Sequence, residues 1–310
     1  MNEIKFSLII PHHDIPDLLV RCLESVPVRN DLQVIVIDDA SSLENIECLK
    51  LIEKKYSYAE FIYLPLGKGG GAARNIGLSK ASGDYVLFAD ADDFFTPCFN
   101  QALDDVLKIE ADVFFFNAIS VDTNDYTFTY RCAQLNCLIK MHNSNPNKAE
   151  FELRYAFGEP WSKIIKRSLI KEKNICFEET RIHNDTRFSY LVGHYARKIH
   201  IDQRAIYCIT DRIGSVSKVL TPERLIIRAK VFAEANKFFA ENGVKRFDER
   251  AIRPLIKFIM RRDLRNFFIC KNALIEIGVK PALIYFKLFV YPYYAIRKFI
   301  EKIYQYKVHL

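Results

Sequence analysis

The feature that most constrains the fold is an alternation of short apolar runs with segments of helical spacing near the start of the chain. The runs at 6–10, 34–37 and 61–64 have the length and β-branched content of buried strands. The segments 16–26 and 43–52 between them carry apolar residues at helical spacing. This order is typical of a parallel sheet with crossover helices. The sequence therefore predicts an α/β fold.

Polar residues follow the predicted strands. Pro11 is expected to stop the first strand, ahead of His12 and His13, because it cannot donate to the ladder. Asp38 and Asp39 follow the second strand. In parallel α/β sheets, ligands bind beyond the carboxyl ends of the strands. We therefore expect a functional site at this edge of the sheet.

A further apolar run, Tyr85–Ala89, ends in three carboxylates, Asp90, Asp92 and Asp93. Carboxylates crowded at the end of a buried strand repel one another and lose solvation, unless a cation or a set of donors compensates them. A divalent metal that also grips a pyrophosphate would do so. The alternative is an acidic cap, with one of the last two aspartates opening a helix through Pro97.

The stretch Gly67–Gly71 is rich in glycine and precedes a predicted helix, Ala72–Ala81. Glycines let the backbone approach a ligand closely, and the start of a helix favours anions. The stretch lacks the ending of a phosphate-binding P-loop and the spacing of a dinucleotide-binding turn. A plain flexible connection explains it equally well.

A family resemblance rests on five motifs, which occur in the order FSLIIPHHD, VIVIDDASS, GGAARNIGLSKASGDYVLFADADD, PWSKIIKRSLIKEKNICF and HNDTRFSYLVGHYARKIHI. Together they resemble the family 2 glycosyltransferases, which have the GT-A fold. The resemblance implies a GT-A domain over residues 1–218. It also implies an inverting enzyme that takes a sugar from a nucleotide diphosphate, with a UDP-sugar as the expected donor and Mn²⁺ or Mg²⁺ as cofactor.

The resemblance assigns one group of residues to the nucleotide. Pro11 and His13 would lie against the base, and Asp39 would bond to it, with Asp38 beside it. Arg74 would also face the nucleotide. The family usually has Tyr-Asn where this chain has His13 and the residue after it. An imidazole can still stack on a base, but more weakly and with sensitivity to pH.

A second group is assigned to the ribose, the phosphates and the metal. The resemblance implies that Asp90 faces the ribose and that Asp92 ligates the metal bridging the phosphates, with Asp93 nearby. Lys68 is a candidate phosphate contact in the glycine-rich stretch that replaces the family's usual polar loop. A metal at this place would spread the charge that develops on the leaving nucleoside diphosphate.

The remaining candidates lie further along the chain. Asp185 matches the family's general base, although the glutamate that usually precedes it is Asn184 here. The alternative role for Asp185 is the N-cap of a helix. Trp161 would line the sugar site, with core packing as its alternative. Arg212 and Ser215 match a family segment near the phosphates, and either could be an ordinary loop residue.

Charge is unevenly divided along the chain. Residues 1–215 carry 25 Lys and Arg against 30 Asp and Glu, whereas residues 216–310 carry 20 against 8. We therefore expect a second, basic helical region, 219–310, that meets something anionic, such as a membrane surface or nucleic acid. The last segment, 281–310, mixes tyrosines, aliphatic residues and lysines, as interfacial helices do, so the expected partner is an anionic membrane surface and not nucleic acid. A helix packed on the transferase core or in a homodimer interface is the alternative.

The sequence also suggests a compartment. The eight cysteines are scattered and contain no Cys-x-x-Cys pair, which is typical of buried thiols in a reducing environment. The first apolar run is too short for a signal peptide, and no run of 18 uncharged apolar residues could span a membrane. We expect a cytoplasmic protein, peripheral on the inner face of the cell membrane.

Three functions compete at this stage. The first is a glycosyltransferase of polysaccharide biosynthesis that acts on a hydroxyl of a saccharide or a lipid-linked saccharide. The second is a phosphatase with Asp90 as nucleophile, which fits poorly because Phe94 stands where a small residue is expected and the motif is not at the first strand. The third is a non-catalytic nucleotide-sugar-binding or membrane-associated scaffold, in which the site altered at Asn184 no longer turns over.

Overall fold

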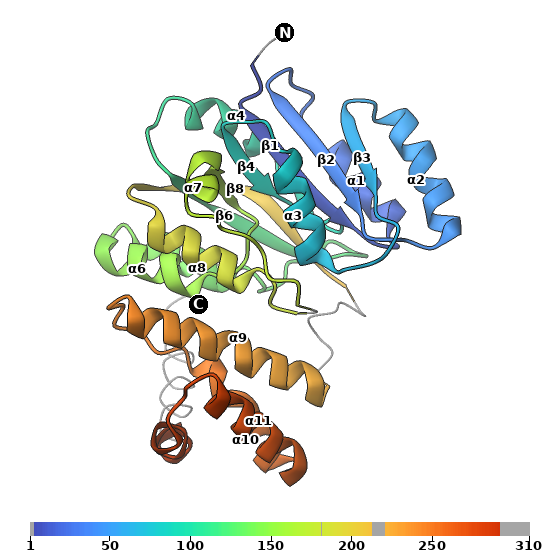
Figure 1. The fold of residues 1–310 in the computed structure, drawn as a ribbon. Coiled ribbons are helices and arrows are strands. Elements are labelled where there is room, and N and C mark those ends of the chain that lie inside the picture. The colour runs from blue at the N-terminus through green and yellow to red at the C-terminus, as the bar shows by residue number, and fades with distance from the viewer. Residues whose placement is uncertain (1–2, 181, 213–220, 292–310) are drawn as a thin grey trace. The chain divides into compact units, whose positions relative to one another are not determined.

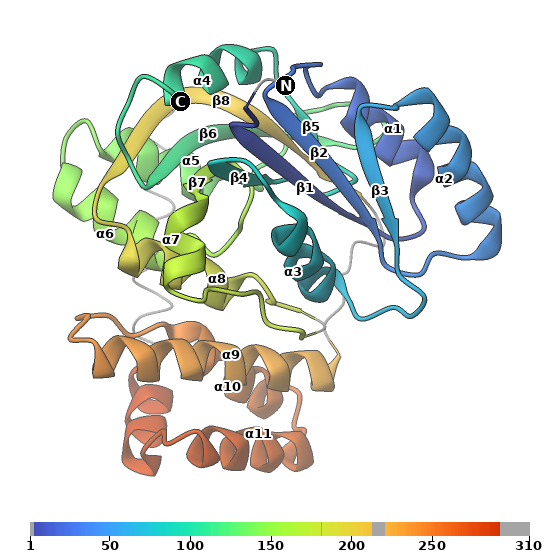
Figure 2. The same ribbon diagram turned by 45° about the horizontal axis from the view of Figure 1, so that its top comes forward.

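The computed structural model describes residues 3–180, 182–212 and 221–291 (Figure 1 and Figure 2). The chain divides into two compact units, Met1–Val216 and Ser217–Leu310. Within the described ranges, the first unit contains strands and helices and the second contains helices only.

The described strands of the first unit form one sheet in the order β3-β2-β1-β4-β7-β6-β8-β5. The strands are β1 Phe6–His12, β2 Leu32–Asp38, β3 Ala59–Tyr63, β4 Tyr85–Phe88, β5 Phe94–Phe95, β6 Val113–Asp122, β7 Lys163–Lys166 and β8 Ile199–Asp211. The helices are α1 Pro16–Glu24, α2 Leu43–Lys55, α3 Gly70–Lys80, α4 Cys98–Val106, α5 Ala133–Met141, α6 Pro146–Ala156, α7 Arg167–Glu172 and α8 Thr186–Tyr195.

The first four strands in chain order are parallel, which confirms the predicted α/β class. Their spatial order reverses direction after β3, because β4 lies on the far side of β1. Right-handed crossovers therefore put α1 and α2 on one face of the sheet and α3 on the other. Figure 1 shows α3 in front of the sheet. The reversal makes a switch point between β1 and β4, where doubly wound sheets bind ligands. The other half of the sheet is mixed, since β7 runs antiparallel to both of its neighbours.

Strand β1 continues through Pro11 to His12, so the prediction that Pro11 stops it was wrong. Ala89 donates its N–H to the carbonyl of Ile9 on one side of β1, and Asp39 donates to the carbonyl of His12 on the other. By this alternation the nitrogen of Pro11 faces the side of β4, beyond the end of that strand. No ladder hydrogen bond is lost there, and the proline is tolerated.

Other boundaries also moved. Helix α3 begins at Gly70, two residues before the predicted start, and β3 is Ala59–Tyr63 rather than 61–64. The polar stretch 122–147, in which no element was predicted, contains α5 and the start of α6.

Helix α3 packs closely on the sheet because it carries Gly77. A Cβ atom at this position would lie 2.4 Å from Cγ2 of Ile9 and 2.9 Å from Cδ1 of Ile37. Any larger residue would push α3 away from β1 and β2. The close packing fixes the helix, and with it Arg74, against the core of the first unit.

The second unit is built from α9 Pro222–Glu241, α10 Arg253–Met260 and α11 Leu264–Glu276, with a 3₁₀ turn at Glu249–Ala251. The residues 281–291 are also helical. These elements enclose a separate apolar core, which includes Leu225, Phe232, Leu255, Phe258, Leu274 and Ile284.

Residues 281–291 show two unlike faces. Ile284 is fully buried in the core of the second unit, and Lys287 donates to Glu249 at 2.8 Å. On the other side, Tyr285, Phe286 and Phe289 are 55%, 58% and 85% exposed. One face is therefore part of the second unit's own core, whereas the alternative had placed this helix on the transferase core. The rest of the predicted segment, 292–310, lies outside the described residues.

The cysteines differ from expectation. All eight are free thiols, but only Cys22, Cys132, Cys208 and Cys270 are buried, and the other four are exposed. Over the described ranges, the structure has no helix of the length and apolar character needed to cross a bilayer.

Candidate active site

Three parallel strands end close together at the switch point. His12 at the end of β1 pairs with Asp38 at the end of β2, and Phe88 at the end of β4 pairs with Ile9. The aspartates that follow β2 and β4 therefore lie at one edge of the sheet, as the sequence predicted. Figure 2 shows β1, β2 and β4 side by side.

Asp39 is held by the glycine-rich stretch. Its two carboxylate oxygens accept N–H groups from Lys68 at 2.8 Å and from Gly69 at 2.7 Å. His13 contacts the carbonyl of Asp39 through Nδ1 at 3.0 Å, and its side chain is 58% exposed. Asp39 thus fixes this stretch beside the site, while each oxygen retains a further acceptor position. The side chain of Lys68 points to solvent, since the residue is exposed.

Asp38 belongs to a buried network rather than to an open surface. Its carboxylate accepts hydrogen bonds from Nδ1 of His12 at 2.9 Å and from the hydroxyl of Ser41 at 2.5 Å. Ile15 donates its N–H to Nε2 of His12, so Nδ1 carries the proton. Burial opposes ionisation of Asp38, but these hydrogen bonds outweigh it and lower the pKa of the carboxyl. Spacing in the sequence gave no sign of the part played by His12.

Arg74 joins two distant segments at the site. Its guanidinium donates to Asp90 at 2.5 Å and to the side-chain oxygen of Asn184 at 3.1 Å. The approach of the second segment depends on Gly71, where a Cβ atom would lie 2.1 Å from the carbonyl oxygen of Glu178. Asn184, which stands where the family usually has a glutamate, is therefore a hydrogen-bond partner of Arg74. The asparagine supplies a neutral acceptor to Arg74, where a glutamate would add a charge.

Asp92 and Asp93 have different surroundings. Asp92 accepts a hydrogen bond from Nε of Arg212 at 3.0 Å, and burial together with the charge of Asp90 raises the pKa of its carboxyl. Asp93 is 2% exposed and accepts hydrogen bonds from the hydroxyl of Tyr207 and the N–H of Thr210. Its burial and the two neighbouring aspartates raise the pKa of Asp93 well above its ordinary value. Asp93 supports the turn from inside.

The alternative of an acidic helix cap was wrong for both residues. The next helix, α4, begins only at Cys98, with Pro97 at its N-cap position and strand β5 in between. Among the residues that the structure describes, no group of three or more His, Cys, Asp or Glu side chains is placed to hold a metal. A metal here would be held by Asp90 and Asp92 together with ligands from a substrate.

Asp185 occupies the N-cap position of α8, but its side chain accepts no capping hydrogen bond. Burial of the carboxyl, followed by the negative charge of Glu159, raises the pKa of Asp185 to about 7, with the charge of Arg74 opposing. The residue as a whole is partly exposed. A carboxyl with a pKa near neutrality is suited to proton transfer.

Two residues whose charges interact with that of Asp185, Lys163 and Glu159, were not singled out in the sequence. Lys163 is 2% exposed, and its ammonium donates to the carbonyl of Phe157 at 3.1 Å. Burial lowers the pKa of Lys163 to about 7, while the charges of Glu159 and Asp185 oppose this shift. Lys163 ends the segment PWSK, and Glu159 directly precedes it. Only Trp161 was singled out in this part of the sequence.

Trp161 packs inside the first unit. It is 8% exposed, and its ring stacks on that of Tyr207 at a centroid distance of 5.8 Å and meets Phe157 edge-on at 5.1 Å. These contacts correspond to the core-packing alternative. Ser215, the last sequence candidate, lies outside the described residues.

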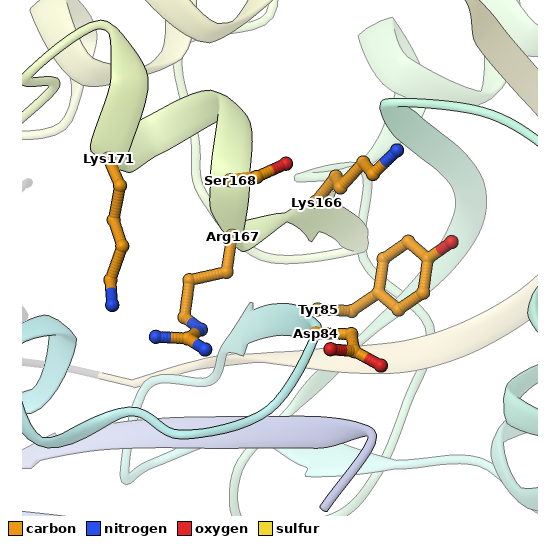
Figure 3. A pocket seen from close by; sticks show the side chains of 6 residues that line it. All are labelled: Asp84, Tyr85, Lys166, Arg167, Ser168 and Lys171. Carbon is orange, nitrogen blue, oxygen red and sulfur yellow. The ribbon is translucent and has the colours of Figure 1, made fainter.

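A separate pocket lies at the other end of β4. Its lining includes Asp84, Tyr85, Lys166 and Arg167, as Figure 3 shows. Tyr85 begins β4, whereas the candidate site follows the end of that strand. Arg167 is already engaged by the carbonyls of Ser82 and Gly83. The pocket is therefore distinct from the edge at which the aspartates gather.

Comparison with known proteins identifies the family of this chain. A family model described as "Glycosyl transferase family 2" matches residues 7–172. The chain is 27% identical to a poly(ribitol-phosphate) beta-glucosyltransferase of Bacillus spizizenii over 56% of this chain and 27% of the relative. It is also 27% identical to a cholesterol galactosyltransferase of Borreliella burgdorferi, over 77% of this chain and 72% of the relative. The chain thus spans only about a quarter of the length of the first of these relatives.

The fold has solved neighbours. The structure of S. aureus TarS 1–349 in complex with UDP-GlcNAc superposes with a TM-score of 0.60 at 19% identity, covering 88% of this chain and 92% of TarS 1–349. At this identity the likeness concerns the fold alone. It confirms the GT-A-like architecture predicted from the motifs.

Proposed function

Because the chain belongs to glycosyl transferase family 2, we propose that it transfers a sugar from a nucleotide diphosphate to an acceptor hydroxyl, with inversion at the anomeric carbon. The observation that carries the proposal is the gathering of Asp39, Arg74, Asp90 and Asp92 at the carboxyl ends of β1, β2 and β4, with Asp185 tied to them through the Arg74–Asn184 contact.

The proposed donor is a UDP-sugar. The TarS neighbour was solved with UDP-GlcNAc, and Asp39 lies at the end of β2, where the resemblance puts the base contact. Each carboxylate oxygen of Asp39 can accept one more hydrogen bond beside the N–H groups that it already accepts. The proposed acceptor is a hydroxyl of a saccharide or a lipid-linked saccharide; the relatives are named for other hydroxyl-bearing acceptors, poly(ribitol-phosphate) and cholesterol.

Asp90 and Asp92 are suited to hold a divalent cation. Magnesium is commonly held by one or two carboxylates together with substrate phosphates. Burial and then the charge of Asp90 raise the pKa of Asp92, and Arg212 offsets this shift only in part. We propose that Asp92, with Asp90 beside it, would hold Mn²⁺ or Mg²⁺. When bound, the cation would neutralise charge on the departing diphosphate.

Asp185 is the proposed general base. Its carboxylate would take the proton of the acceptor hydroxyl as the hydroxyl oxygen forms a bond to the anomeric carbon and the bond from that carbon to the diphosphate breaks. The electron pair of the broken bond leaves with the nucleoside diphosphate. A base with a pKa near 7 is half ionised at neutral pH and still a good proton acceptor.

The test is a calorimetric titration of the full chain with UDP and UDP-sugars, in Mn²⁺ and in chelator, followed by an assay of UDP release with a panel of saccharide acceptors. Metal-dependent binding and acceptor-dependent release are expected. If no nucleotide binds in either condition, the transferase proposal is wrong. If nucleotide binds but the wild type and Asp185→Ala show the same absence of release, the scaffold function is favoured.

A further inference from the structure

The turn between α10 and α11, residues 259–269, exposes a concentration of apolar side chains; we call it the α10–α11 corner. Met260, Leu264 and Phe268 are 79%, 63% and 51% exposed, and Ile259 and Ile269 are each nearly half exposed. Residues 221–291 contain nine such exposed large hydrophobic side chains, against eight in the far longer described part of the first unit. Single exposed apolar residues are ordinary, but a cluster of this kind indicates a contact surface.

The same corner is strongly basic. Arg261, Arg262 and Arg265 are all exposed. The only acidic residue within the corner is Asp263, whose carboxylate accepts the N–H of Asn266 at 3.1 Å and so caps α11. Three exposed guanidinium groups against one carboxylate therefore leave this corner with a net positive charge beside its exposed apolar side chains.

The backbone of the corner is well defined. The N–H of Asp263 donates to the carbonyl of Phe258, and the N–H of Arg262 donates to that of Ile259, which together form a Schellman end to α10. Arg262 has φ 55°, in the left-handed region where such ends usually place glycine. The turn thus holds the exposed side chain of Arg262 on a defined backbone.

We propose that the α10–α11 corner binds the surface of a bilayer that contains anionic lipid. The apolar side chains would enter the headgroup boundary, and the three arginines would contact lipid phosphates. A second copy of the chain fits less well, because a two-fold contact would bring the same arginines against one another. A nucleic acid would leave Met260 and Leu264 unburied. The inference is independent of the proposed catalytic chemistry.

The test is co-sedimentation of the full chain with vesicles of phosphatidylcholine alone and with added phosphatidylglycerol. We expect binding only to the anionic vesicles, weakening as salt is raised. The triple variant Arg261→Gln, Arg262→Gln, Arg265→Gln should bind about 100-fold more weakly. Replacing Met260, Leu264 and Phe268 together by serine should weaken binding at least about tenfold.

Matched controls separate this surface from others. Leu43→Ser with Leu51→Ser removes apolar side chains that are 85% and 66% exposed on α2, and should leave binding unchanged. Serine at Tyr285, Phe286 and Phe289 tests the outer face of 281–291. Circular dichroism and thermal unfolding confirm that each variant folds.

Several outcomes would overturn the proposal. They are wild-type binding by both corner variants, equal binding to uncharged vesicles, or loss confined to the variant of residues 281–291. Sedimentation velocity adds one more: self-association that the serine variant abolishes, without vesicle binding, would make the corner a dimer interface instead.

Discussion

The two units of this chain use charge in opposite ways. In the first, functional charges lie at the sheet edge and are paired, as Arg74 is with Asp90 and Arg212 with Asp92. In the second, the arginines of the α10–α11 corner are exposed beside apolar side chains. Paired, partly buried charges keep fixed positions, which suits chemistry. Exposed charges on a firm backbone suit recognition of a surface.

In both units, a run of charged residues in the sequence contains residues that face a functional surface and residues that only support the structure. The three aspartates after β4 look alike in the sequence, yet Asp93 is internal and supports the turn while Asp90 and Asp92 face the site. In the second unit, basic residues that are paired within the unit and basic residues on its surface are equally alike in sequence. Lys287, for example, is paired with Glu249. Only burial and partners distinguish function from support.

The largest expected effect is on turnover in the first unit. Asp185→Asn should lower the rate of UDP release by about 10³-fold, since general bases contribute about 10² to 10⁴. Nucleotide affinity measured by calorimetry should stay within about twofold, because Asp185 is tied to the nucleotide edge only through Arg74 and Asn184. Turnover at the wild-type rate would remove Asp185 from the mechanism.

The second prediction concerns the inner face of residues 281–291. Ile284→Ala should destabilise the second unit by about 2 to 5 kcal/mol, because a fully buried isoleucine leaves a cavity. Phe289→Ala, 85% exposed on the other face, is the matched control and should change stability by less than about 0.5 kcal/mol.

Denaturant titrations can report the two units separately. The only tryptophan, Trp161, lies in the first unit, so its fluorescence follows that unit, while circular dichroism at helical wavelengths follows both. Ile284→Ala should shift the dichroism transition and leave the fluorescence transition in place. A shift of both together would mean that the units unfold as one.

The third prediction concerns the stability of the first unit instead of the second. Tyr207→Phe removes the hydroxyl that donates to Asp93 at 2.9 Å and accepts the N–H of Asp90 at 2.8 Å, but keeps the ring that stacks on Trp161. The loss should cost the first unit about 1 to 3 kcal/mol, since buried polar partners are left unpaired. Here the fluorescence transition should move. An unchanged midpoint would show that water replaces the hydroxyl.

The smallest effect is a shift in pH dependence. The proposed base is active when ionised, so kcat/KM should rise with pH through the pKa of Asp185, near 7. Glu159→Gln removes a negative charge that raises this pKa, so the rising limb should move to lower pH by less than about one unit. Glu60→Gln, exposed on β3, is the control. A limb that stays in place, or moves upward, would contradict the proposed coupling.

The spacing of apolar residues, together with the residues that interrupt the apolar runs, predicted most of the fold. The alternation of apolar runs with helical spacing predicted the parallel half of the sheet, because strand and helix periods differ and each must bury one face. It failed at Pro11 because tolerance of a proline depends on which neighbour its nitrogen faces. It also missed α5 and α6, whose polar sequence becomes helical on packing.

The candidate site was predicted less completely than the fold. Aspartates at strand ends are visible in sequence, and their neighbourhood follows from parallel topology. Their partners are not visible, since Arg74 meets Asn184 across 110 positions and Tyr207 meets Asp93 across 114. Gly71 was interpreted as part of a glycine-rich stretch that either approaches a ligand or is a plain flexible connection, whereas its missing Cβ admits the carbonyl of Glu178.

By itself, the sequence determined the family, the α/β class, the edge at which polar residues gather and the change from an acidic to a basic region, because these depend on local period, order and composition. Tertiary structure alone decided that Trp161 and Asp93 are internal, that Asp185 is uncapped with a raised pKa, and that the apolar side chains of the α10–α11 corner stay outside the core. Those properties depend on burial and on partners far away in the chain, which local pattern does not record.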